Sequence, residues 1–100
     1  SMPVKEARIV TWHPQGKKGV NISLAKYEQI KKFILDTIQA KHEISFEALT
    51  DLAVSKLTGK FDGKVIWYMV TVKLDLEARK LIERIPKTSP HKLRIAKGIS

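Results

Sequence analysis

Apolar residues recur at every third or fourth position in three successive stretches of the chain, and this period restricts the fold to a largely helical architecture. The clearest stretch begins after Ser23, whose hydroxyl is suited to capping a helix N-terminus. Polar residues fall on the opposite side, so the sequence predicts an amphipathic helix over residues 24–41. Its apolar stripe consists of Leu24, Tyr27, Ile30, Ile34, Leu35 and Ile38.

A second helix is predicted from residue 46 to about residue 57. Ser45 is a suitable N-cap, and Glu47 lies in the first turn, where the helix dipole favours a carboxylate. The segment 58–63 contains two glycines and should end this helix. The apolar stripe consists of Phe46, Leu49, Leu52, Ala53 and Leu57.

The segment 64–79 carries two opposing signals. Its many β-branched residues favour a strand, whereas the spacing of its polar residues and its length favour a helix. We take the period as decisive, and we predict a helix that is buried on two flanks and has one narrow polar face. Lys64, Tyr68, Thr71, Asp75 and Arg79 form that face.

The remaining segments favour short strands. Residues 7–12 are β-rich and end at His13-Pro14, and a basic turn follows over residues 15–19. Two alternating runs, 81–85 and 91–95, flank a short turn and predict a β-hairpin. The order is that of an α+β winged helix-turn-helix: three helices and a C-terminal β-hairpin wing, here with an extra N-terminal β-strand. We therefore divide the chain into an N-terminal strand and basic turn (1–22), a winged-helix domain (23–96) and a frayed tail (97–100).

The stretch from Trp67 to Arg84, which includes Leu74-Asp75-Leu76-Glu77-Ala78-Arg79, resembles the passage from recognition helix to wing in bacterial winged-helix transcriptional regulators. It also resembles a small uncharacterised bacterial protein family that shares this stretch. The resemblance covers about residues 23–96 and implies the winged-helix fold. Lys80 departs from the pattern, which has glycine there, so we expect the loop to be adjusted instead of adopting a tight left-handed cap.

Charge is unevenly distributed along the 100 residues, whose formal net charge is +9. The segment 23–58 is neutral, whereas the segments 1–22 and 59–100 carry net charges of +3 and +6. A basic chain of this kind favours a polyanionic partner. The chain has no cysteine, no apolar run of the ~20 residues that a membrane span needs, and no signal-peptide pattern. We therefore expect a cytoplasmic protein without membrane contact.

Duplex DNA is the expected partner, with the third helix in the major groove and the wing on the phosphate backbone. Such a helix needs long polar side chains on one face, and the wing needs cations. This interpretation predicts a small basic transcriptional regulator or DNA-associated module. The candidate contacts are Lys60, Lys64, Tyr68, Thr71, Arg79, Lys87, His91, Lys92 and Arg94.

A protein-interaction or dimerisation module without direct nucleic-acid binding is the alternative. The third helix has two apolar flanks, and one of them needs a cover that the N-terminal strand or a second copy could supply. Large apolar groups at Trp12, Trp67, Val70 and Leu74 form the candidate interface of a homodimer, unless both tryptophans belong to the core.

Catalysis has little support in the sequence. The three histidines, His13, His42 and His91, lack the spacing of metal ligands, and both Ser23 and Ser45 are explained as helix caps. Residues 15–19 lack the Gly-Lys-Ser/Thr ending of a phosphate-binding loop. We therefore expect no enzyme activity, no metal and no cofactor.

Overall fold

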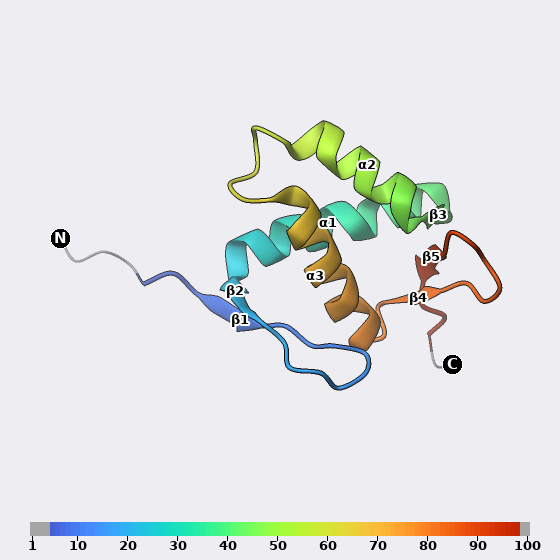
Figure 1. The fold of residues 1–100 in the computed structure, drawn as a ribbon, viewed down its shortest axis with the longest axis horizontal. Helices are drawn as coiled ribbons and strands as arrows, with labels where there is room; N and C mark the ends of the chain where they lie inside the picture. The colour runs from blue at the N-terminus through green and yellow to red at the C-terminus, as the bar shows by residue number, and fades with distance from the viewer. Residues whose placement is uncertain (1–4, 99–100) are drawn as a thin grey trace.

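Three helices and two small antiparallel sheets form an α+β fold in the computed structural model, which describes residues 5–98 (Figure 1). The helices are α1 (Leu24–Lys41), α2 (Phe46–Leu57) and α3 (Val65–Ala78). The strands are β1 (Arg8–Val10), β2 (Asn21–Ser23), β3 (Glu43–Ser45), β4 (Ile82–Arg84) and β5 (Lys92–Ile95). All three predicted helices are confirmed, and α1 has the predicted bounds.

The N-caps predicted for α1 and α2 are present in the structure, and their apolar stripes face the interior. The Ser23 hydroxyl accepts a hydrogen bond from the Lys26 amide, and the Ser45 hydroxyl accepts one from the Ala48 amide. Each cap satisfies a backbone donor that the first turn of a helix leaves without a partner. The buried stripe of α1 consists of Tyr27, Ile30, Ile34 and Ile38.

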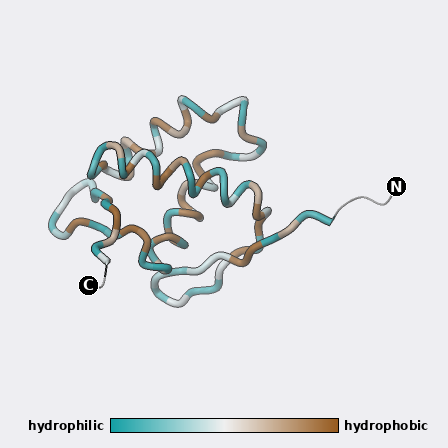
Figure 2. The backbone as a smooth tube through the Cα atoms, turned by 180° about the vertical axis from the view of Figure 1, so that it is seen from behind, coloured by the Kyte–Doolittle hydropathy of each residue, from teal (hydrophilic) through white to brown (hydrophobic). Residues whose placement is uncertain are grey.

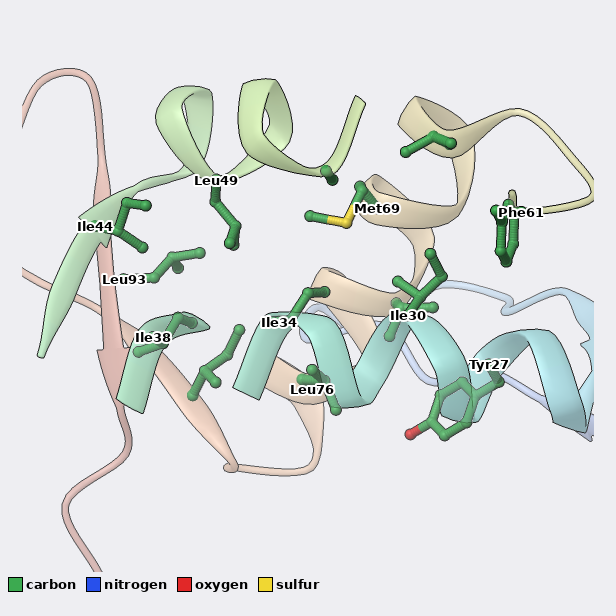
Figure 3. Packing of buried hydrophobic residues seen from close by; sticks show 14 of the residues in the cluster. Tyr27, Ile30, Ile34, Ile38, Ile44, Leu49, Phe61, Met69, Leu76 and Leu93 are labelled. Atoms are coloured by element: carbon green, nitrogen blue, oxygen red, sulfur yellow. The ribbon is translucent and has the colours of Figure 1, made fainter. Parts of the chain in front are cut away.

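The core lies where α1, α2 and α3 meet the C-terminal hairpin (Figure 3). Leu49 of α2 and Met69 of α3 are fully buried beside the isoleucine stripe of α1. Leu93 of β5 closes the core at the end nearest β3. Side chains from all three helices thus share one apolar interior, which fixes how α3 is oriented.

The C-terminal hairpin of β4 and β5 is confirmed, and it belongs to a three-stranded sheet in the order β3-β5-β4. Glu43 pairs with Arg94 across β3 and β5, and Glu83 pairs with the same arginine across β4 and β5. The third strand of this sheet, β3, lies in the short segment between α1 and α2.

The N-terminal strand is also confirmed, but it has a partner that we did not predict. β1 pairs with β2 in an antiparallel hairpin, with Arg8 opposite Ser23. Beyond the paired residues, the Thr11 amide donates to the Val20 carbonyl at 2.8 Å. A Cβ atom on Gly19 would lie 1.6 Å from the Thr11 carbonyl oxygen, so only glycine permits this close approach.

The left-handed cap at the end of α3 corrects our expectation for Lys80. Its φ is +65°, and the turn makes both hydrogen bonds of a Schellman motif. The Lys80 amide donates to the Glu77 carbonyl, and the Leu81 amide donates to the Leu76 carbonyl. These two bonds, together with the connection to the following strand β4, hold a lysine in a conformation that usually requires glycine.

We expect Lys80→Gly to raise the free energy of unfolding by about 1 kcal/mol, because glycine removes the crowding of Cβ in the left-handed region. Thermal unfolding should show a midpoint about 4–8 °C higher. Lys60→Gly is the matched control, since Lys60 is exposed and is not among the residues with positive φ. A Lys80→Gly midpoint at or below that of the natural chain would contradict the assignment of strain.

Within residues 5–98, no helix has the length and apolar character needed to cross a membrane. The frayed tail that we predicted over residues 97–100 falls partly on residues 99–100, which lie outside the described residues, as do residues 1–4 of the N-terminal segment.

Candidate interaction surface

The predicted polar face of α3 is largely buried or half-buried, although Lys64 at its start is exposed. Asp75, which we placed on this face, is fully buried against α1. Tyr68 is half-buried and packs edge-on against the Phe61 ring, with centroids 4.9 Å apart. Arg79 is half-buried and pairs with Asp75 four residues before it. The polar arc thus faces the helical interior, and this part of α3 has few groups to offer a DNA groove.

Asp75 connects three segments of the chain. Its carboxylate accepts hydrogen bonds from the Trp12 amide at 2.8 Å, from the Tyr27 hydroxyl, and from the Arg79 guanidinium at 2.9 Å. Burial raises the pKa of the Tyr27 hydroxyl well above its ordinary value, and the bond to Asp75 acts in the same direction. The carboxylate therefore anchors the β1–β2 hairpin and α1 to α3.

A second buried charge on α3 is Lys73, whose ammonium lies 2.6 Å from the Glu77 carboxylate and 5.1 Å from the centre of the Phe46 ring. Burial lowers the pKa of Lys73, and the pairing with Glu77 partly opposes that shift. Arg84 of β4 reaches the same carboxylate at 3.5 Å. Our reading of the sequence missed this network; its signal was the four-residue spacing of Lys73 and Glu77 between apolar stripes.

The predicted wing contacts are largely paired with acidic or aromatic groups. Lys92 lies 3.4 Å from the Glu43 carboxylate, and Arg94 lies 2.6 Å from that of Glu83. The bond from Arg94 lowers the pKa of Glu83. His91 stacks on the Phe46 ring with centroids 5.7 Å apart. Burial lowers its pKa, and the positive charges of Lys73 and Arg84 lower it further, which favours a neutral imidazole.

Three predicted contacts, Lys60, Lys64 and Lys87, are exposed or half-buried and have no carboxylate within ion-pair distance among residues 5–98. Lys60 and Lys64 belong to the α2–α3 connection, whereas Lys87 belongs to the β4–β5 loop. Figure 1 shows these two loops at opposite ends of the molecule. The structure therefore does not bring the predicted nucleic-acid contacts together.

The outward side of α3 is apolar instead. Ile66, Trp67 and Val70 expose 58%, 45% and 41% of their surface, although they belong to a helix in contact with both other helices. Leu74 is half-buried beside them. We call the surface formed by Ile66, Trp67, Val70 and Leu74 the apolar α3 face. Single exposed apolar residues are ordinary, but neighbouring ones on one helix indicate a binding surface.

The four predicted interface residues lie close to one another. Trp12, Trp67 and Leu74 line one small hollow of about 140 Å³, and Val70 lies one helical turn from the latter two. Trp12 exposes 55% of its surface, so neither tryptophan belongs to the core. The N-terminal hairpin partly covers the flank of α3, but it leaves Trp67 and Val70 open.

A groove runs between α2 and α3 on this side of the molecule, with a volume of about 590 Å³. Val54 of α2 forms one wall, and Ile66, Trp67 and Val70 form the other. Lys64 lies at its rim. The sequence placed Ile66 in an apolar stripe without marking it as a contact, and it gave no sign that Val54 faces the same space.

The match to a protein-family model covers residues 8–93, from the first residue of β1 into β5. The model describes a family of unknown function, DUF6958. The chain belongs to this family. No curated protein and no solved structure matches the chain. The DUF6958 match includes the N-terminal hairpin, the three helices, β4 and the whole apolar α3 face.

The charged groups of this DUF6958 chain are mostly paired within the fold. Across the described part of the chain, no three histidine, aspartate or glutamate side chains gather as metal ligands. The buried ionisable groups Lys73, Asp75 and Glu77 all have partners of opposite charge within the fold. What the surface offers is an apolar groove with Lys64 at its rim.

Proposed function

We propose that this DUF6958 chain is a protein-interaction module of the winged-helix type, and that the apolar α3 face joins two copies in a homodimer. Three helices followed by the β4–β5 hairpin support the winged-helix assignment, as does the resemblance of residues 67–84 to the passage from recognition helix to wing. A cytoplasmic location is part of the proposal, because a chain without cysteine fits a reducing compartment.

The outward side of α3 is the observation that carries this proposal. A DNA-binding winged helix lays that side in the major groove, where recognition requires hydrogen-bonding groups that reach base edges. Here the side presents Ile66, Trp67 and Val70, while the charged residues of α3 are paired and turned inward. Exposed aromatic and aliphatic residues beside a groove are typical of protein interfaces.

Duplex DNA binding is the second candidate, and the distribution of charge favours it. The net charge is +9, and near the N-terminus of α3 both Lys60 and Lys64 lie without a carboxylate partner in the described part of the chain. In this alternative, the lysines contact phosphates and the affinity is almost independent of sequence.

Sedimentation at 50 and 500 mM salt separates the two candidates. We expect reversible dimers that become more stable at higher salt, because salt screens the repulsion between two chains of charge +9. The variant Trp67→Ser/Val70→Ser should dissociate at least about tenfold more readily, as expected when central apolar anchors are truncated. Val10→Ser is the control, since Val10 is an apolar residue even more exposed than Trp67 and Val70 but belongs to β1.

If the chain stays monomeric and binds duplex DNA with an affinity that falls steeply with salt, the second candidate function is correct and the first is wrong. Monomers without duplex binding at low salt would contradict both.

A further inference from the structure

Trp12 combines wide exposure with a rigid attachment. Its backbone amide donates to the buried Asp75 carboxylate at 2.8 Å, and its ring lies over the Arg79 guanidinium at 4.2 Å from the ring centre. Arg79 is itself held by two hydrogen bonds to Asp75. The indole is therefore fixed on one side by a stacked cation, while 55% of the residue stays open to solvent.

A fixed aromatic surface of this kind suits a planar ligand. Stacking of a flat ring on the open side would cost little conformational entropy of the tryptophan, because its side chain is already held in place. Nucleobases are planar, and they stack on protein aromatic rings without strong sequence preference.

Positive charge surrounds this ring from two separate segments. A hollow of about 330 Å³ beside Trp12 is lined by His13 and Lys17 of the β1–β2 loop and by Lys80 at the end of α3. Lys18 lines the neighbouring hollow on the other side. Figure 1 shows the β1–β2 loop beside the C-terminal end of α3, and Figure 2 shows that loop in the colours of hydrophilic residues.

No acidic residue interrupts this surface on the N-terminal side, because residues 7–27 contain no aspartate or glutamate. The nearest carboxylate of α3, that of Asp75, is buried and already paired with Arg79. Glu77 and Glu83 line a further hollow beyond Lys80, but neither lines the two hollows beside Trp12, where the charged side chains are cationic. Such a lining complements a phosphate backbone.

We propose that Trp12 and the lysines around it form a binding site for single-stranded nucleic acid. A base stacks on the open side of the indole, and Lys17, Lys18 and Lys80 contact the flanking phosphates. A duplex fits less well, because its bases are already stacked on one another and the site offers no polar helix face to a groove. This site goes beyond the proposed dimerisation through α3 and does not depend on it.

The test measures binding of the full chain to a labelled 12-nucleotide oligo(dT), to oligo(U) of the same length and to a 12-base-pair duplex, by fluorescence anisotropy at low salt. We expect both single strands to bind at least about tenfold more tightly than the duplex. Trp12→Leu removes the aromatic ring but retains the backbone amide that donates to Asp75. This variant should bind single strands at least about tenfold more weakly.

The double variant Lys17→Gln/Lys18→Gln tests the phosphate contacts, and its salt dependence should lose about 1.4 units of logarithmic slope, which corresponds to two single-strand phosphates. The matched control Lys41→Gln/Lys56→Gln removes the same charge from exposed lysines of α1 and α2, and it should leave the affinity within about twofold and the slope unchanged. Circular dichroism and thermal unfolding establish that each variant is folded.

Any of three results would contradict the proposed site. They are equal affinity for duplex and single strands, equal losses of affinity in the two double lysine variants, and unchanged affinity in a folded Trp12→Leu chain. Sedimentation of Lys17→Gln/Lys18→Gln keeps this result distinct from the proposed function. Lys18 lines the small hollow that Trp67 and Leu74 also line, but neither lysine is an apolar anchor of α3, so their loss should leave the dimer associated.

Discussion

Asp75→Asn should lower the free energy of unfolding by about 3 kcal/mol, because it removes one charge of a largely buried ion pair and leaves its partner behind. Asp75 is fully buried and accepts hydrogen bonds from Trp12, Tyr27 and Arg79. Asparagine has one acceptor oxygen and an NH₂ group that cannot accept, so at least one of these donors loses its partner. Urea unfolding followed by circular dichroism measures the change.

The matched control is Asp36→Asn, which makes the same chemical change in an exposed pair. Asp36 lies 2.7 Å from the Lys32 ammonium on α1, and both side chains are well over half exposed. Such helical surface pairs contribute about 0.3–0.5 kcal/mol. If the two variants lost similar stability, Asp75 would not be the buried anchor that the hydrogen bonds indicate.

Met69→Ala is expected to lower the free energy of unfolding by about 2–5 kcal/mol, the range for truncating a large apolar side chain in a closed core. Met69 has no exposed surface and lies between α1 and α2 (Figure 3). A domain of ordinary stability has only about 5–15 kcal/mol in total, so the variant should melt far below the natural chain.

The adjacent residue supplies the comparison, because Val70 belongs to the same helix turn but is 41% exposed. Val70→Ala should change stability by no more than about 0.5 kcal/mol, in line with surface substitutions. Calorimetry of the two variants at a concentration where the chain is monomeric gives both values. A large loss in Val70→Ala would show that the apolar α3 face supports the monomer's own stability, and it would weaken the case for a docking surface.

Periodicity predicted the helices well because burial of a stripe is what forms them. The stripe of α1 from Tyr27 to Ile38 is buried as a whole, and Ser23 caps the helix as its position indicated. In α3 the period predicted helix correctly against the β-propensity of Val65 and Ile66. Packing against two other helices outweighs the small intrinsic cost of β-branched residues in a helix.

The orientation of α3 could not be read from the same pattern. We placed Asp75 on an exposed polar face and made no assignment for Lys73, but both are buried because each meets an opposite charge inside the fold. For Asp75, two of its donors come from Trp12 and Tyr27, far away in sequence. β2 was missed for a similar reason, since three residues carry no period and its partner lies across a long loop.

The hydrogen bonds at Asp75 also affect how the protein unfolds. The carboxylate ties residue 12, residue 27 and residue 79 to one point, so releasing the N-terminal hairpin would leave a buried charge with an empty hydrogen-bonding position. Fraying that begins at β1 is therefore opposed until α1 and α3 separate as well. We therefore expect the N-terminal hairpin to unfold together with the helices as one cooperative unit, although in the ribbon it resembles an appendage (Figure 1).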